Sequence, residues 1–248
     1  MTRAVRSSFD ELAAAYDRYR IGYADDLYDA LEECGVHAGA RVLDVACGTG
    51  IVTEELFRRG CVMTGIDISE PMLTLARKRV PAAAFATASA EELPYSNDTF
   101  DAATSAQAFH WLDHATALAE LARVVRPGGI VAIWWKGLMR GDATLHVREE
   151  TARSLGLASP SDLLGTEFDA FDASPLIEQR LRVIPWIVRM RVGDYLGYER
   201  TRARARHAYG ASLEEYFGRL AERLGPPDGE LSLSYLHLLY LGRVPGRA

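Results

Sequence analysis

The feature that most constrains the fold is an apolar segment that runs directly into a glycine-rich turn. Residues 42–46 read Val-Leu-Asp-Val-Ala, residues 47–50 read Cys-Gly-Thr-Gly, and residues 51–56 have the composition of a helix start. Glycine lets a backbone turn sharply and lets a ligand approach closely. Asp44 lies inside the apolar strand, where a carboxylate is costly unless a cation or a hydrogen-bond donor meets it. The pattern predicts a strand–turn–helix unit that binds a nucleotide, with a cationic ligand over the strand end.

A second apolar segment, residues 61–67, ends in another acid, Asp67, 17 residues after Gly50. In a parallel βαβ unit the two acids end adjacent strands, and a carboxylate at this position can accept hydrogen bonds from both ribose hydroxyls. Two other readings stay open. The dinucleotide fingerprint needs a third glycine, where this chain has Thr53. An ordinary tight turn between strand and helix is the second.

A third segment, Ala88 to Tyr95, precedes a strand predicted over residues 100–106. Together the three segments resemble the motifs of class I S-adenosylmethionine (SAM) methyltransferases, whose acid-x-x-x-Gly-x-Gly loop wraps the methionine part of the cofactor. Many members of that family carry Asp where this chain has Ser89. Glu91 and Glu92 are expected to face solvent. The resemblance covers residues 7–136 well and the remainder loosely.

The resemblance implies SAM as the cofactor, with S-adenosylhomocysteine as its product form. Asp67 is expected to bind the ribose, with Ile68 and Met72 as apolar walls beside the adenine. Either the Ser89 hydroxyl or the Ala90 backbone N–H is expected to hydrogen-bond the adenine ring. For Met72 the alternative is that it only packs in the core as part of a helix. The full predicted cofactor set is Arg20, Asp44, Ala46, Gly48, Gly50, Asp67, Ile68, Met72, Ser89, Ala90 and Gln107.

Residues 109–111 read Phe-His-Trp, directly after the strand over residues 100–106. They resemble a branch of the family that includes trans-aconitate methyltransferase-like proteins. Methyl transfer is an in-line displacement in which the enzyme mainly aligns the nucleophile. A hydroxyl nucleophile also needs a base, and histidine titrates near neutral pH. His110 is therefore the predicted catalytic residue, with helix capping or packing against Trp111 as the alternatives.

Two further segments carry candidate residues. In related enzymes a stretch like residues 16–20 folds over the cofactor and contacts its carboxylate, which makes Arg20 the candidate cofactor contact and Tyr19 a substrate contact. Tyr16 is a further candidate in this stretch, but it falls at helical spacing, which favours packing in the core. Arg202 and Arg206 share one helix face and are predicted to grip an anionic substrate. A solvated basic helix is the alternative for that pair.

The predicted fold is α/β, a doubly wound Rossmann-like sheet of seven mostly parallel strands with an antiparallel last strand and a helical cap. One domain is expected over residues 1–248, with amino-terminal helices over the cofactor in 1–35, the SAM-binding core in 36–136, and the cap in 192–229 between the last two strands. Helices are predicted over 10–19, 25–33, 53–59, 71–80, 114–124 and 143–155. Strands are predicted over 41–46, 61–67, 100–106, 130–135, 180–191 and 231–241. Residues 126–129 are predicted as a turn, and residues 159–175 as a loop with short helical turns.

Composition restricts the partners. Apolar residues make up 48% of the chain and the formal net charge is −6, which disfavours a general nucleic-acid binder. The expectations are a small-molecule acceptor, no nucleic acid and no membrane, because no apolar run approaches about 20 residues. The three cysteines have no metal spacing, so no metal and a cytoplasmic location are predicted.

These observations predict a SAM-dependent methyltransferase that methylates a small molecule at a carboxylate or hydroxyl oxygen. Three alternatives stay open. Transfer to nitrogen or carbon would use the same cofactor site. A SAM-binding protein without catalysis would keep that site and lose a substrate pocket. A nicotinamide-dependent oxidoreductase would share the fold, but the missing third glycine counts against it.

Overall fold

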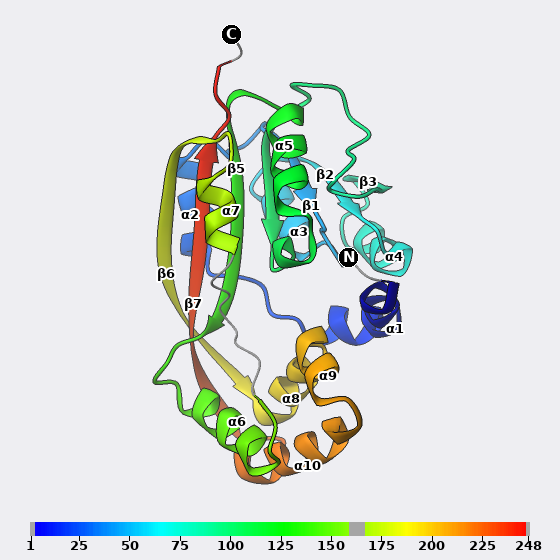
Figure 1. Cartoon of the computed structure of the whole chain (residues 1–248), viewed down its shortest axis with the longest axis vertical. Coiled ribbons are helices and arrows are strands. Elements are labelled where there is room, and N and C mark those ends of the chain that lie inside the picture. Colours follow the sequence, from blue (N-terminus) through cyan, green and yellow to red (C-terminus); the bar gives the residue numbers. More distant parts are fainter. Residues whose placement is uncertain (1–2, 159–166, 247–248) are drawn as a thin grey trace.

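The fold is built on one seven-stranded sheet (Figure 1). The structure, a computed structural model, describes residues 3–158 and 167–246. The strands lie in the order β3-β2-β1-β4-β5-β7-β6. Their bounds are β1 (Arg41–Val45), β2 (Val62–Asp67), β3 (Ala84–Thr87), β4 (Phe100–Ala106), β5 (Val125–Leu138), β6 (Ile177–Arg191) and β7 (Glu230–Arg243). β1 to β5 run parallel and β7 is antiparallel to both neighbours, as predicted.

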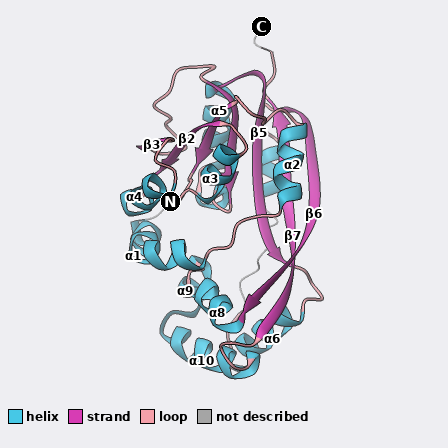
Figure 2. Cartoon of the chain, turned by 180° about the vertical axis from the view of Figure 1, so that it is seen from behind, coloured by secondary structure: helices cyan, strands magenta, loops and turns pink. Residues whose placement is uncertain are grey.

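Helices cover both faces of the sheet, with α5 and α7 on one face and α2 and α3 on the other (Figures 1 and 2). Their bounds are α1 (Arg3–Tyr19), α2 (Asp25–Glu33), α3 (Ile51–Arg58), α4 (Glu70–Arg79), α5 (His114–Val124), α6 (Ala143–Ser154), α7 (Glu167–Asp172), α8 (Val192–Arg200), α9 (Ala203–Tyr209) and α10 (Leu213–Leu224). Two short 3₁₀ turns are η1 (Phe109–Trp111) and η2 (Gly210–Ser212). None of the helices within residues 3–158 and 167–246 is both long and apolar enough to cross a membrane.

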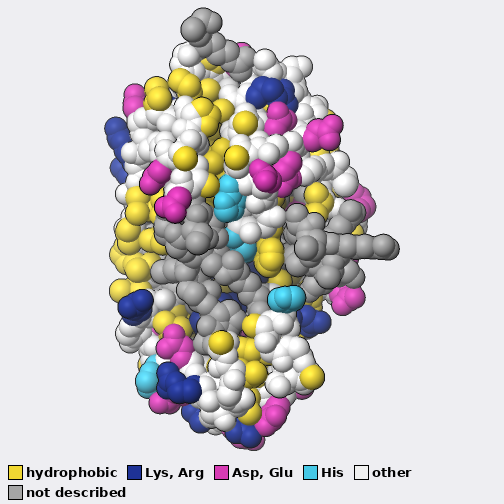
Figure 3. Space-filling view, viewed as in Figure 1, with side chains coloured by type: hydrophobic (Ala, Val, Ile, Leu, Met, Phe, Trp, Pro, Cys, Tyr) yellow, Lys and Arg dark blue, Asp and Glu magenta, His cyan; other side chains and the backbone are white. Residues whose placement is uncertain are grey.

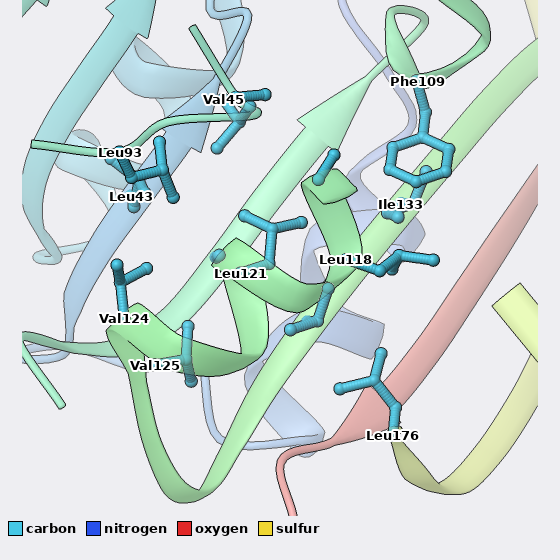
Figure 4. Close-up of a cluster of buried hydrophobic side chains, with 14 of the residues drawn as sticks. Leu43, Val45, Leu93, Phe109, Leu118, Leu121, Val124, Val125, Ile133 and Leu176 are labelled. Atoms are coloured by element: carbon cyan, nitrogen blue, oxygen red, sulfur yellow. The ribbon is translucent and has the colours of Figure 1, made fainter. Parts of the chain in front are cut away.

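Residues 126–129, predicted as a turn, are assigned to the start of β5, and the chain bends back there after Val125, with φ 76° at Gly128 (Figure 4). Val125 pairs with Phe100, and the register then shifts before Ala102 pairs with Ile130. On the other side, the Gly128 N–H donates to the Val244 carbonyl over 2.8 Å. The Pro-Gly-Gly sequence therefore makes an irregularity inside a strand, which neighbours on both sides hold in the sheet. Of the loop predicted over 159–175, residues 159–166 lie outside the described residues, and α7 follows them.

The segment between β6 and β7 is helical, and it contains α8, α9, η2 and α10. These helices form a small apolar core with α6, in which Ala152, Tyr209, Phe217 and Leu220 are buried. Figure 1 shows this group around the lower ends of β6 and β7, below α1. A role as a cap over bound ligands stays a prediction.

β6 is an edge strand whose outward face is apolar. Leu181, Val183 and Ile187 expose 51%, 53% and 70% of their surface, and a band of hydrophobic side chains follows the left margin of the molecule in Figure 3. Pro185 interrupts the backbone donors of the strand, a common way to block pairing at a sheet edge.

Two apolar clusters, one on each face, hold the helices to the sheet. Leu118 and Leu121 of α5 pack on Leu43 and Ile133 (Figure 4). On the other face, helices α2 and α3 pack their buried side chains against β1 and its neighbours. Successive residues of a strand point to opposite faces, so the single short strand β1 serves both clusters. The buried strand ends are thereby fixed in position.

Candidate functional site

A cavity of about 450 Å³ lies at the carboxyl ends of β1, β2 and β4. The strand order reverses between β1 and β4, and open α/β sheets bind ligands at such a switch point. The described residues that line the cavity are Tyr16, Ala46, Gly48, Asp67, Ile68, Ser69, Met72, Ala88, Ser89, Ala90, Glu91, Ala106, Gln107, Ala108, Trp111 and Leu112. Eight of the predicted cofactor residues are among them: Ala46, Gly48, Asp67, Ile68, Met72, Ser89, Ala90 and Gln107.

Two non-glycine residues with positive φ lie at this edge of the sheet. Ala46 follows β1 with φ 54°, and Gln107 follows β4 with φ 57°. The Gln107 backbone N–H donates to the Trp134 carbonyl over 2.9 Å, and its side-chain Nε2 donates to the Lys136 carbonyl over 2.9 Å. Left-handed backbone at a residue with a Cβ costs about 1 kcal/mol or more and is found mostly at functional sites.

Gln107→Val should lower the free energy of unfolding by about 1–2 kcal/mol relative to Gln107→Asn. A β-branched side chain tolerates left-handed backbone poorly, whereas asparagine adopts it readily. Neither replacement keeps the Gln107 side chain that reaches Lys136, so the pair isolates the backbone cost. Urea denaturation of both variants measures the difference, and equal stabilities would contradict the strain.

Asp67 connects the glycine turn to the start of α4. Its Oδ2 accepts from the Gly48 backbone N–H and its Oδ1 from the Ser69 backbone N–H, both over 2.9 Å. Burial raises the pKa of Asp67, and hydrogen bonds from the Ser69 and Gly48 N–H groups oppose the rise. The carboxylate therefore fixes two loops and borders the cavity.

Asp44 does not line the cavity, although it was predicted to contact the cofactor. It is 1% exposed, and its carboxylate accepts from the Thr53 hydroxyl over 2.6 Å and the Thr104 hydroxyl over 3.2 Å. Burial raises the pKa of Asp44 to about 7. Two hydroxyls thus supply the partners that the sequence required. A direct role in cofactor binding stays a prediction.

Gly50, also predicted to bind the cofactor, is not among the residues that line the cavity. It has φ 81° and precedes α3, and a Cβ there would stand 3.1 Å from the Ala76 Cβ of α4. This glycine allows α3 and α4 to approach closely. Its contact with the cofactor stays a prediction.

Helix α1 is fastened beside the cavity by two polar contacts. The Ser69 hydroxyl donates to Asp10 over 2.5 Å and accepts from the Met72 backbone N–H, and the second bond caps α4. Arg79 pairs with Asp17 over 2.6 Å and donates to the Thr49 carbonyl of the glycine turn. These contacts place Tyr16 in the cavity wall, so its expected core position is wrong.

The segment after β3 differs from expectation at one acid. Glu92 is exposed, as predicted, but Glu91 lines the cavity. Its carboxylate accepts from the Ser89 hydroxyl and from the Asp113 backbone N–H. Partial burial raises the pKa of Glu91, but these hydrogen bonds outweigh burial and leave it below its usual value. The sequence alone does not indicate which of two adjacent glutamates points into the cavity.

His110 is adjacent to the cavity but does not line it, whereas Trp111 does. The Nδ1 of His110 accepts from the Trp135 indole N–H over 3.2 Å, and its ring packs on Trp111 with centroids 4.6 Å apart. The packing expected as the alternative is therefore present. The catalytic role stays a prediction.

The predicted substrate residues lie away from the cavity. Arg202 forms an ion pair of 3.0 Å with the buried Glu199. Arg20, predicted to contact the cofactor, does not line the cavity either; it lies between the rings of Tyr16 and Tyr198, at 4.4 and 4.9 Å from their centroids. The structure does not bring Tyr19, Arg202 and Arg206 to the cavity, and their roles stay predictions.

The charged side chains among the described cavity residues are Asp67 and Glu91, both acids. Such a lining favours a cationic ligand over an anionic one. Separately, the described ranges contain no group of three or more His, Cys, Asp or Glu placed to hold a metal ion.

Comparison with known proteins identifies the region around this cavity. Residues 43–133 match a family model described as a methyltransferase domain. The chain is 36% identical over 131 residues to the malonyl-[acyl-carrier protein] O-methyltransferase of Salmonella typhimurium, covering 52% of each chain. It is 37% identical over 136 residues to a demethylmenaquinone methyltransferase of Mycobacterium sp., covering 52% of this chain and 58% of that relative. The match spans about half the length of the curated relatives.

A solved structure of a candidate type II methyltransferase from Anaeromyxobacter dehalogenans shares the fold. Its TM-score is 0.71 at 24% identity, over 92% of this chain and 100% of that chain. The motif order, the strand order and the family match agree. Residues 43–133 are therefore similar to a methyltransferase domain, and the chain has the fold of the solved methyltransferase structure.

Proposed function

We propose that this protein transfers a methyl group from SAM to a small-molecule acceptor, and that the cavity at the ends of β1, β2 and β4 holds the cofactor. One observation carries the proposal. A half-buried acid, Asp67, borders a cavity of about 450 Å³ at the topological switch point. This is where an open α/β sheet binds a nucleotide, and where a carboxylate binds ribose hydroxyls.

The residues that line the cavity fit SAM. Ile68 and the 2% exposed Met72 supply apolar surface for an adenine ring, beside Asp67. The small residues Ala46 and Gly48 leave room above the ends of the strands, and a Cβ at Gly48 would meet no atom within 4 Å. The two acidic lining residues suit a ligand with a positive charge.

Bound SAM would supply an electrophilic methyl group on a positively charged sulfur. The protein would hold it through Asp67, the Gly48 turn, and Ser89 or Ala90. Gln107, fixed by its bond to the Lys136 carbonyl, would form the wall beside the acceptor. Tyr16, Trp111 and Leu112 would exclude water from the reacting groups.

We place the acceptor atom at oxygen, in a carboxylate or hydroxyl, within a branch marked by Phe-His-Trp at residues 109–111. His110 supports this choice because it follows the cavity residue Ala108 by two positions and is a candidate base for a hydroxyl. The names of the two relatives point to different acceptors, so the relatives do not decide the atom.

The amino-terminal helices and the 192–229 insertion are proposed to cover the bound cofactor and acceptor. Support comes from α1, which presents Tyr16 to the cavity, and from the next residue, Arg20, which contacts Tyr198 of α8. The Arg20 Nη2 also donates to the Thr201 carbonyl over 3.3 Å. The described residues of the insertion do not themselves line the cavity, so their proposed effect passes through α1.

Calorimetric titration of ligand-free protein with S-adenosylhomocysteine tests the cofactor site, and transfer of labelled methyl from SAM to a panel of carboxylates, phenols and amines tests the reaction. We expect binding at micromolar concentration and an oxygen-methylated product. With a hydroxyl acceptor, His110→Ala should lower the rate without changing the affinity for S-adenosylhomocysteine.

Each alternative has its own result. Absence of S-adenosylhomocysteine binding, together with binding of a nicotinamide cofactor, would replace the proposal by an oxidoreductase. Binding without turnover on any acceptor would favour a SAM-binding protein without catalysis. Product methylated at nitrogen or carbon would keep the cofactor site and overturn the choice of oxygen.

A further inference from the structure

A second concave surface lies where α1 ends, and we name it the arginine groove. It has a volume of about 490 Å³ and is lined by Arg18, Tyr19, Arg20, Ile21, Arg189, Met190, Arg191, Asp194 and Glu230. These residues come from the carboxyl end of α1, the end of β6, the start of α8 and the start of β7. Figure 2 shows α1 ending beside α8 and α9. The groove and the cavity share no lining residue.

The charges of the arginine groove are not balanced. Four arginines line it against two acids, Asp194 and Glu230. Within the described part of the chain, Arg18, Arg189 and Arg191 have no carboxylate within 4.0 Å, although both acids share the groove with them. Exposed arginines with no carboxylate nearby are common on protein surfaces. Here three such arginines converge on the arginine groove from two segments that lie far apart in the sequence, which is a more specific sign of a binding site.

Arg20 gives the second, independent observation. Its Nη2 donates to the Thr201 carbonyl, but its Nε is shielded from solvent and has no hydrogen-bond partner. A buried donor left without a partner costs about 1–3 kcal/mol. Lys136 lies on the inner side of the same segment, where its Nζ donates to the Ile21 and Gly22 carbonyls over 2.7 Å. Arg20 and Lys136 thus flank one backbone segment, and no carboxylate within the described ranges pairs with either of them. Burial lowers the pKa of Lys136 well below its ordinary value.

We propose that the arginine groove binds the phosphate group of a small molecule, at a site separate from the methyl-transfer cavity. Guanidinium groups present forked N–H donors that match the oxygens of phosphate, and such charge-assisted bonds are the strong ones. The cavity repels such an anion, because its charged lining residues are Asp67 and Glu91. The proposal does not depend on the reaction assigned to that cavity.

Pyrophosphate at low salt is the probe, and its binding is measured by calorimetry. Arg189 and Arg191 are exposed, so the double variant Arg189→Gln/Arg191→Gln should keep the fold. We expect it to bind pyrophosphate at least about tenfold more weakly than the wild type, because two charge-assisted donors are lost. Arg180→Gln is the matched control, since Arg180 is exposed on the same strand and outside the groove. It should leave the affinity unchanged.

A second variant provides a gain of binding. Asp194→Asn/Glu230→Gln removes the two acids of the groove and should tighten pyrophosphate binding, which loss of structure cannot do. Affinity for S-adenosylhomocysteine should stay constant in all these variants, which separates this site from the cavity. Three results would each overturn the proposal: no pyrophosphate binding to the wild type, equal binding by the Arg189/Arg191 variant, or an equal loss in Arg180→Gln.

Discussion

Replacement of Asp67 by alanine is expected to weaken the binding of S-adenosylhomocysteine by about 2–3 kcal/mol, roughly 30- to 150-fold. Two contributions add. The variant loses the charge-assisted bonds that the carboxylate would make to the ribose. It also releases the Gly48 and Ser69 N–H groups, which Asp67 now holds at 2.9 Å on either side of the cavity. Calorimetric titration of the two proteins measures the change.

Asp228→Ala is the control, because Asp228 is exposed and lies outside the cavity. It should bind S-adenosylhomocysteine as the wild type does. Circular dichroism establishes that the Asp67 variant is folded at the temperature of the titration. A folded Asp67→Ala protein with wild-type affinity would remove Asp67 from the cofactor site and leave it as a residue that shapes the loop.

The sequence predicted most of the sheet, because the signals there are local. An apolar run that ends at Asp67, or a capping Ser69 before Glu70 and Pro71, needs only neighbours in the chain to be recognised. β4 and α5 have the predicted bounds for the same reason. β5 was predicted too short because its ends depend on pairing with distant strands.

The cavity lining was harder to predict, because it depends on which side of an element faces inward. Tyr16 has the spacing of a core residue and lies in the cavity wall instead, since Asp10 and Asp17 anchor α1 to Ser69 and Arg79. These contacts join residues 59 and 62 positions apart. Neither the hydrophobic periodicity of α1 nor any motif in it indicates these two contacts. The basic residues predicted to bind an anionic substrate, Arg202 and Arg206, also lie outside the cavity.

Asp44→Asn should change how the stability of the protein depends on pH. Burial raises the pKa of Asp44 from its ordinary value of 3.8 to about 7. A raised carboxyl pKa means that the folded state holds the proton more tightly than the unfolded chain does. The stabilisation is complete below about pH 4 and is lost as the pH rises towards about 7, on the order of 4 kcal/mol in total. Asparagine has the same shape and no proton to lose.

Urea denaturation at about pH 5 and about pH 8 measures this, and the wild type should lose about 2–3 kcal/mol relative to Asp44→Asn between the two. Burial lowers the pKa of His237 to about 4, and its titration is common to both proteins and cancels.

Asp101→Asn is the control. Partial burial raises the pKa of Asp101, but bonds from Arg41 and Arg126 hold it at about 2. Its contribution is therefore lost only in acid and is constant across this range. Parallel pH profiles for the wild type and Asp44→Asn would show that Asp44 is already charged at about pH 5, with its two threonine hydroxyls sufficient to stabilise the carboxylate.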